Sequence, residues 1–98
     1  MDNKKPAMDI LGVPVTPFSM AEAVAWLMAR VEQELPTQVV TANAEIIMMA
    51  QQMPAYRALL QKTDLILADG AGTVWAGRTL GNQVPERVAG FDLFLELL

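Results

Sequence analysis

The sequence contains no cysteine and no histidine. Without cysteine the chain can form no disulfide framework and has no thiolate nucleophile. Without histidine, any proton transfer within it must use a carboxylate, a lysine, a tyrosine or water. The two absences together exclude a metal site built from Cys and His side chains.

Charged residues are also scarce, at 18% of the chain, and the seven basic residues are outnumbered by eleven acidic ones. The basic residues are scattered and form no patch, which argues against broad nucleic-acid binding. Apolar residues make up 53%, more than a small domain needs for its core. We therefore expect some apolar surface to contact a partner, which would be more of the chain, another subunit or a membrane.

No run of residues approaches the roughly 20 apolar residues that span a bilayer. The charged start, residues 1–6, has no apolar run behind it and does not read as a secretory signal. The cytoplasm is therefore the expected compartment. The 98 residues suffice for one domain, with a disordered tail expected at 1–6 and the domain at 7–98.

The apolar pattern predicts alternating strands and helices. Residues 8–15 form a strand or small hairpin in which Pro14 argues against a central strand. Ser19 and Glu22 fit a capping box at the start of a helix that ends near Glu34. The later elements are expected to be a strand at 38–41, helices at 43–50 and from 54, a strand at 65–68, a helix at 73–80, an extended piece at 84–89 and an apolar helix at 91–98. This order predicts an α/β fold with a mostly parallel sheet flanked by helices. The apolar end at Leu98 suggests truncation, and a frayed natural C-terminus is the alternative.

Two short loops follow predicted strands, Thr41–Glu45 and Asp69–Gly72. In open parallel sheets, ligands bind beyond the carboxyl ends of the strands. Each loop also opens a helix, where free N–H groups and the helix dipole favour an anion. Chemistry in this chain is therefore expected at these two loops.

In the first loop, Thr41 and Asn43 offer short side chains that donate and accept hydrogen bonds, which suits a sugar hydroxyl or a phosphate oxygen. The local pattern by itself favours a plain structural role, in which Asn43 caps the helix and Thr41 closes the strand. Glu45 falls in the first helical turn, where a carboxylate is favoured by the dipole in any case.

In the second loop, Gly70 and Gly72 allow close backbone approach to a ligand. Asp69 would project from the strand end, where a carboxylate can take a proton from an attacking hydroxyl. It could instead bind a ribose or a metal ion, or cap the next helix. The loop is neither a phosphate loop nor a full dinucleotide fingerprint.

A third candidate segment spans residues 85–93, Pro-Glu-Arg-Val-Ala-Gly-Phe-Asp-Leu. Its Arg87 could pair with a phosphate through the planar guanidinium fork. The alternative for Arg87 is a salt bridge at the surface or between loops.

The three segments together resemble ordered motifs of the WecG/TagA/CpsF glycosyltransferases: Thr-Ala-Asn-Ala-Glu at 41–45, Ala-Asp-Gly-Ala-Gly at 68–72 with Val-Trp at 74–75, and the segment 85–93. The opening Ile-Leu-Gly-Val-Pro-Val at 10–15 also fits the start of that family. Each motif is weak alone, and their order and spacing make the resemblance specific. Members of the family are longer, so the chain looks like their N-terminal portion.

The resemblance implies a Rossmann-like fold and an inverting, metal-free transfer of N-acetylmannosamine, or a related sugar, from UDP to polyprenyl-diphosphate-linked N-acetylglucosamine in the synthesis of teichoic acid or a similar cell-surface polymer. It implies that Asp69 is the general base, that Thr41, Asn43, Gly70 and Gly72 line the substrate site, and that Arg87 binds a ligand. It further implies a peripheral attachment of the full-length protein to the inner face of the cell membrane, a homo-oligomer, and no cofactor. The alternative is a nucleotide-binding or oligomeric interaction module without catalysis.

Overall fold

The strand β4 (Leu65–Ala68) is completely buried and has neighbours along both of its edges. The computed structural model describes residues 5–69, 74, 78 and 88–98. On one edge, β4 pairs in parallel with β3 (Val39–Ala42), so that Val39 lies beside Leu65. On the other edge, the N–H of Thr16 donates to the carbonyl of Ile66 at 2.7 Å, and the N–H of Val88 donates to the carbonyl of Ala68 at 2.6 Å. The parallel pairing predicted for these two strands is confirmed.

The predicted start of the domain is a hairpin of β1 (Met8–Ile10) and β2 (Val13–Val15), which pair antiparallel. The two turn residues, Leu11 and Gly12, have φ angles of 51° and 89°. Positive φ at both positions is typical of a type I′ turn, which matches the twist of the two strands. The hairpin leads directly into Thr16, whose bridge to β4 ties this small second sheet to the central strand.

The helix α1 (Met20–Glu32) begins at the predicted capping box, which is confirmed. The hydroxyl of Ser19 accepts from the N–H of Glu22 at 3.2 Å, and the Glu22 carboxylate accepts from the N–H of Ser19 at 2.9 Å. Lys5 donates to the same carboxylate at 2.9 Å, whereas residues 1–4 of the expected tail lie outside the described residues. The helix ends two residues before the predicted Glu34, which adopts a positive φ of 55°.

The first candidate segment, residues 41–45, lies between a strand and a helix as predicted, but the strand ends one residue later than the predicted Thr41. Thr41 and Ala42 belong to β3, because pairing with β4 continues through Ala68. The next helix, α2 (Ala44–Gln52), already contains Ala44 and Glu45, so Asn43 alone connects the strand to the helix. After α2, Pro54 opens α3 (Pro54–Gln61), as the sequence predicted.

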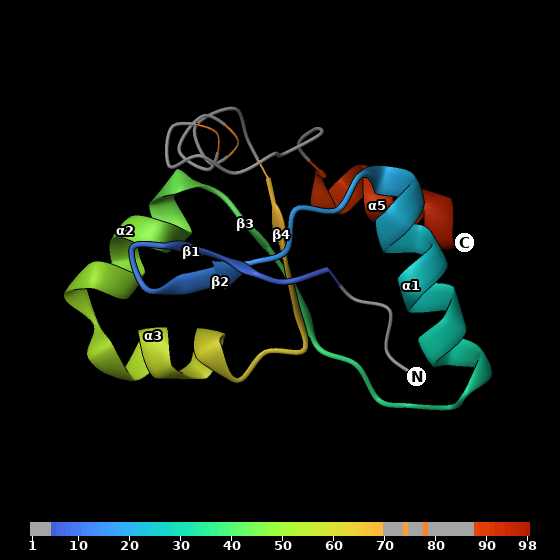
Figure 1. Ribbon diagram of the computed structural model, residues 1–98, viewed down its shortest axis with the longest axis horizontal. Coiled ribbons are helices and arrows are strands. Elements are labelled where there is room, and N and C mark those ends of the chain that lie inside the picture. Colours follow the sequence, from blue (N-terminus) through green and yellow to red (C-terminus); the bar gives the residue numbers. More distant parts are fainter. Residues whose placement is uncertain (1–4, 70–73, 75–77, 79–87) are drawn as a thin grey trace.

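The two faces of the β3–β4 pair are covered by different helices (Figure 1). Residues on one face, including Ile66 and Ala68, pack with the hairpin, α2 and α3. Residues on the other face, including Leu65 and Leu67, pack with α1 and with α5 (Gly90–Leu97). Side-chain alternation along a strand explains this division. An α/β arrangement with helices on both faces is therefore present in the described part of the chain.

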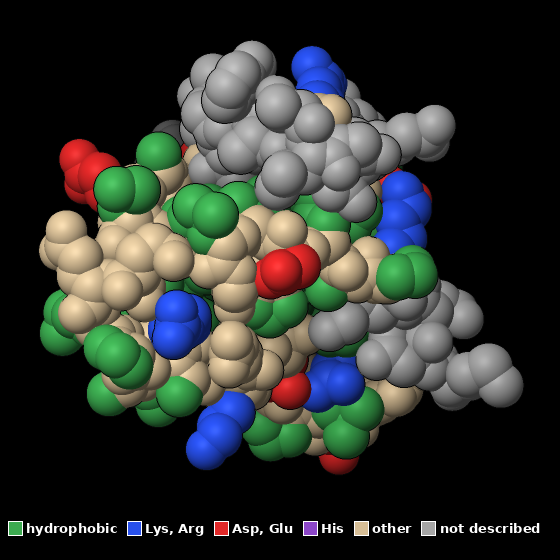
Figure 2. Space-filling view, turned by 60° about the vertical axis from the view of Figure 1, so that its left-hand side comes forward, with side chains coloured by type: hydrophobic (Ala, Val, Ile, Leu, Met, Phe, Trp, Pro, Cys, Tyr) green, Lys and Arg blue, Asp and Glu red, His purple; other side chains and the backbone are tan. Residues whose placement is uncertain are grey.

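Several large hydrophobic side chains remain exposed, as the composition predicted. On the side formed by α2 and α3, which Figure 2 brings forward, hydrophobic side chains reach the surface, and those with large exposed fractions include Met48, Met49, Met53 and Leu59. On α5 they include Phe94 and Leu95. Within the described residues, no helix is long and apolar enough to cross a membrane.

Val74 and Arg78 are both helical, in agreement with the helix predicted at 73–80. The rest of that segment lies outside the described residues, as does most of the extended piece predicted at 84–89.

Candidate functional site

The carboxyl ends of β3 and β4 lie side by side because the two strands are parallel and in register. Thr41 is opposite Leu67, and Ala42 is opposite Ala68. The N–H of Asp69 still donates to the carbonyl of Ala42, at 2.9 Å, so Asp69 stays next to the end of β3. The pairing therefore brings two of the predicted site residues, Thr41 and Asp69, to one edge of the sheet.

Both side chains also meet the same third element, the N-terminus of α5. The N–H of Gly90, the first residue of α5, donates to Oδ2 of Asp69 at 3.4 Å. A Cβ atom built on Gly90 would lie only 2.8 Å from Oγ1 of Thr41. Thr41, Asp69 and Gly90 thus form one contact group on the face of the sheet covered by α5.

Asp69 replaces the capping side chain that α5 lacks. The residue before the helix, Ala89, has no side-chain acceptor for the free N–H groups of the first turn. The carboxylate of Asp69 supplies one from the end of β4, in a region where the helix dipole favours negative charge. Asp69 thus has a capping role at α5, whereas the N–H groups of the segment that directly follows Asp69 lie outside the described residues. Oδ1 of Asp69 makes no hydrogen bond with any described residue.

Asn43 stands at the same strand end and caps α2. Its Oδ1 accepts from the N–H of Ile46 at 3.0 Å, which is the structural role that the sequence allowed. The side chain is exposed, and its amide nitrogen makes no hydrogen bond with the described residues. Because the cap uses only the oxygen, Asn43 can serve as a cap and still donate to a ligand. Glu45 is exposed in the first turn of α2.

Three further predicted residues, Gly70, Gly72 and Arg87, lie outside the described residues. Later residues of the segment that carries Arg87 do reach the site. The N–H of Val88 donates a hydrogen bond to the end of β4, and Gly90 lies close to Thr41 and donates a hydrogen bond to Asp69. Gly90 belongs to the third candidate segment, but the sequence pattern does not predict it as a site residue. Its signal was its place between the strand-like Val-Ala and a helix, where a small residue permits close approach of two backbone segments.

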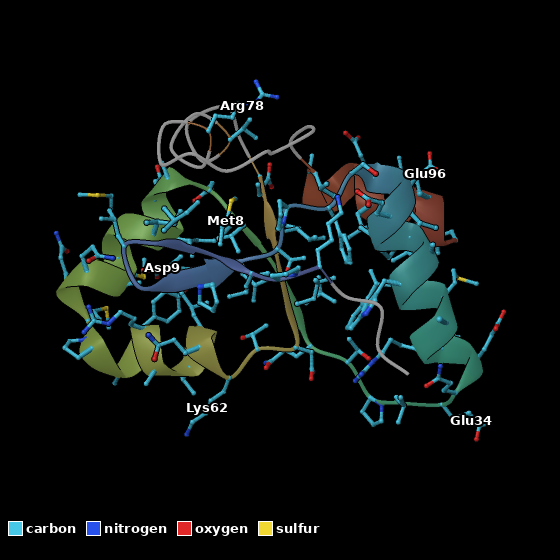
Figure 3. All side chains as sticks on the ribbon, in the orientation of Figure 1. Met8, Asp9, Glu34, Lys62, Arg78 and Glu96 are labelled. Atoms are coloured by element: carbon cyan, nitrogen blue, oxygen red, sulfur yellow. The ribbon has the colours of Figure 1, made fainter. Side chains whose placement is uncertain are left out.

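Arg78 is exposed and lies at the end of the molecule where β4 ends (Figure 3). Within the described residues, no group of three or more His, Cys, Asp or Glu side chains could hold a metal ion. The arrangement that is present, a carboxylate with hydroxyl and amide groups at parallel strand ends, is suited to binding a polyol and removing a proton from it.

Comparison with known proteins identifies the family. The model of the glycosyl transferase WecG/TagA/CpsF family matches residues 8–98, which is almost the whole chain. The chain belongs to this family. The match includes all three segments that carried the resemblance in the sequence, as well as the hairpin and α1.

Curated relatives carry the name N-acetylglucosaminyldiphosphoundecaprenol N-acetyl-beta-D-mannosaminyltransferase. The protein from Bacillus spizizenii is 47% identical over 60 residues, which are 61% of this chain and 23% of the relative. The protein from Bacillus subtilis is 35% identical over 68 residues, 69% of this chain and 27% of the relative. The protein from Staphylococcus aureus strain NCTC 8325 is 34% identical over 94 residues, 93% of this chain and 37% of the relative. The chain therefore spans between about a quarter and just over a third of the length of these relatives.

Proposed function

We propose that residues 7–98 are the N-terminal part of a single glycosyltransferase domain that moves N-acetylmannosamine, or a related sugar, from UDP to a polyprenyl-diphosphate-linked N-acetylglucosamine. The observation that carries the proposal is the placement of Asp69 beside Thr41 at the carboxyl ends of two parallel strands, in a chain whose family is that of the WecG/TagA/CpsF glycosyl transferases. The names of the relatives specify the sugar transferred and the acceptor. The product would be a linkage unit of teichoic acid or of a similar cell-surface polymer.

The fold proposed for the whole domain is Rossmann-like. A parallel strand pair with helices on both faces supports it, as does the clustering of candidate residues where such folds bind nucleotides. The acceptor carries a polyprenyl chain, so the complete protein would work at the inner face of the cell membrane. The apolar side chains exposed on α2, α3 and α5 are compatible with a homo-oligomer or with further chain packing there.

In the proposed reaction, a hydroxyl of the acceptor sugar attacks the anomeric carbon of the donor from the side opposite to UDP. The new C–O bond forms as the bond to UDP breaks, which inverts the configuration of the anomeric carbon. Oδ1 of Asp69 takes the hydroxyl proton, because a neutral hydroxyl is a poor nucleophile. The departing UDP gains negative charge, and Arg87 together with helix N-termini would stabilise it. Thr41, Asn43 and the backbone at Gly70 and Gly72 would position the sugars, and no metal ion takes part in this scheme.

The test is the variant Asp69→Asn in a full-length protein that carries this segment. Asparagine keeps an oxygen that accepts from the N–H of Gly90, so the cap of α5 is retained, but it cannot take a proton. We expect kcat for sugar transfer to fall by about 10²- to 10⁴-fold, the usual contribution of a general base, with donor binding by calorimetry preserved. Near-normal turnover with an intact fold would eliminate the assigned role.

A matched control is available on the same strand pair. Asp64 precedes β4 at its opposite end, where its carboxylate accepts from the N–H of Gln38 at 2.7 Å. Asp64→Asn makes the same chemical change far from the proposed site, and transfer should stay within about twofold of the parent. Binding of UDP and of the UDP-sugar without any transfer by the unmodified protein would favour the rival function, a nucleotide-binding module.

A further inference from the structure

We infer that Gly90 is a positioning residue: it lets the N-terminus of α5 come close enough to Thr41 to hold the Asp69 carboxylate in a fixed orientation. This inference rests on the proposed function, because it assigns Gly90 a task in the same site. Three observations carry it: the lack of space for a Cβ atom on Gly90 beside Thr41, the hydrogen bond from Gly90 to Asp69, and the hydrogen bond from Val88 to the end of β4.

The contact between Gly90 and Thr41 leaves no room for a side chain. A Cβ on Gly90 would lie 2.8 Å from Oγ1, 3.5 Å from Cγ2 and 3.7 Å from Cβ of Thr41. Thr41 is β-branched and stands in a strand, so its χ1 rotation is restricted. An added methyl group would therefore displace the start of α5 away from β3.

The conformation of Gly90 does not itself require glycine. Its φ lies outside the left-handed region, and it occupies the first position of α5. Alanine is generally favoured over glycine in a helix. On helix propensity alone, Gly90→Ala would stabilise the protein, so any loss that the substitution causes must come from the contact with Thr41.

The displacement of α5 would act on Asp69. The N–H of Gly90 binds Oδ2, which leaves Oδ1 for the acceptor hydroxyl. A second hydrogen bond holds this geometry, because the N–H of Val88 donates to the carbonyl of Ala68, the residue immediately before Asp69. A shift of α5 would stretch the already long 3.4 Å hydrogen bond and leave the carboxylate free to rotate. Misplacing a catalytic group by about 1 Å can cost about a hundredfold in rate.

The test is a double-mutant cycle with Gly90→Ala and Thr41→Ala in a full-length protein that carries this segment, with transfer kinetics and thermal midpoints measured for all four forms. We expect Gly90→Ala alone to lower kcat by at least tenfold and up to about a hundredfold, with KM changed less than about threefold, and to lower the midpoint. Thr41→Ala removes the atoms that the new methyl group would meet. In that background Gly90→Ala should leave kcat unchanged within about threefold and raise the midpoint, in line with its helix propensity.

Other results overturn the inference. If Gly90→Ala alone keeps kcat within about twofold of the parent, the residue has no positioning role. If it raises KM only, the methyl group acts on the Thr41 hydroxyl and not on Asp69. If the two substitutions lower kcat independently, with the double variant showing the product of both losses, the contact does not carry the effect. Glu96→Ala, an exposed substitution in the last turn of α5 (Figure 3), is the control and should change nothing.

The cycle separates this inference from the proposed function. If the unmodified protein transfers no sugar, the proposed function fails. The thermal midpoints then still test whether Gly90 packs against Thr41. A midpoint that Gly90→Ala lowers in the parent but raises in the Thr41→Ala background supports this packing role. A midpoint that Gly90→Ala raises in both backgrounds refutes it.

Discussion

Replacing Glu22 by glutamine separates the two interactions that its carboxylate makes at the start of α1. The carboxylate accepts from the N–H of Ser19 and from the ammonium group of Lys5, both at 2.9 Å. These hydrogen bonds, that of Lys5 foremost, lower the pKa of Glu22 from its ordinary value of 4.5. Glutamine keeps an oxygen that accepts from the Ser19 N–H, since Gln also completes a capping box. It removes the negative charge that interacts with Lys5 and with the helix dipole.

The magnitude follows from the exposure of the pair. The side chains of Lys5 and Glu22 are 41% and 39% exposed, so solvent screens their attraction and the ion pair contributes less than about 1 kcal/mol. The lost interaction with the helix dipole adds about 0.3 to 1 kcal/mol. We therefore expect Glu22→Gln to lower the free energy of unfolding by about 1 kcal/mol at pH 7.

The effect should depend on pH in a defined direction. Because folding lowers the pKa of Glu22, the carboxylate stabilises the fold fully above its unfolded pKa, and that stability is lost as the pH falls through the lower folded pKa. The difference between the parent and Glu22→Gln should therefore shrink progressively as the pH falls below 4.5. Urea unfolding followed by circular dichroism at pH 7 and pH 3 measures it.

Ser19→Ala provides the comparison at the same cap. It removes the hydroxyl that accepts from the N–H of Glu22 at 3.2 Å, and loss of such a cap costs about 1 kcal/mol. Since a hydroxyl does not titrate here, this loss should be similar at both pH values. The reasoning is refuted if the Glu22→Gln loss is equally large at pH 3 and pH 7, or if the Ser19→Ala loss disappears in acid.

Two other substitutions test the turn and the second cap. Leu11 is exposed and has a positive φ of 51° in the type I′ turn; Leu11→Asn should raise the free energy of unfolding by about 1 kcal/mol, because asparagine tolerates this conformation, and a lower value in urea unfolding would contradict the turn assignment. Asn43→Asp keeps the oxygen that caps α2 but removes the amide donor; stability should be unchanged within about 0.5 kcal/mol while KM for the sugar substrates rises about tenfold, as expected for loss of a hydrogen bond to a ligand, and an unchanged KM in transfer assays would restrict Asn43 to its capping role.

Local signals in the sequence were sufficient for the elements that local hydrogen bonds define. The Ser19–Glu22 box and the Asn43 cap each involve residues three positions apart, so the sequence pattern contains the whole interaction. The end of β3 depends on its partner strand, and the pattern therefore placed it one residue too early, at Thr41 in place of Ala42.

In the candidate site, too, some features could be predicted from the sequence and others depend on tertiary packing. That Thr41 and Asp69 meet could be predicted, because parallel strands align their carboxyl ends. The part played by Gly90 could not, because it depends on how closely α5 packs against β3, and that distance is set by the core residues beneath the helix, such as Leu67 and Leu93. Contacts between residues so distant in the sequence leave no periodic trace in it.

The alternation of side chains along β4 has a consequence for how this segment tolerates insertions and deletions. Ile66 and Ala68 face the hairpin, α2 and α3, while Leu65 and Leu67 face α1 and α5. Removing or adding one residue within β4 would exchange the two faces and turn Asp69 away from Gly90. The connection from 33 to 36 is exposed and belongs to no strand, so its length is not fixed by a strand register. Natural length variation in this family should therefore be found in that connection and be absent from the four residues before the aspartate.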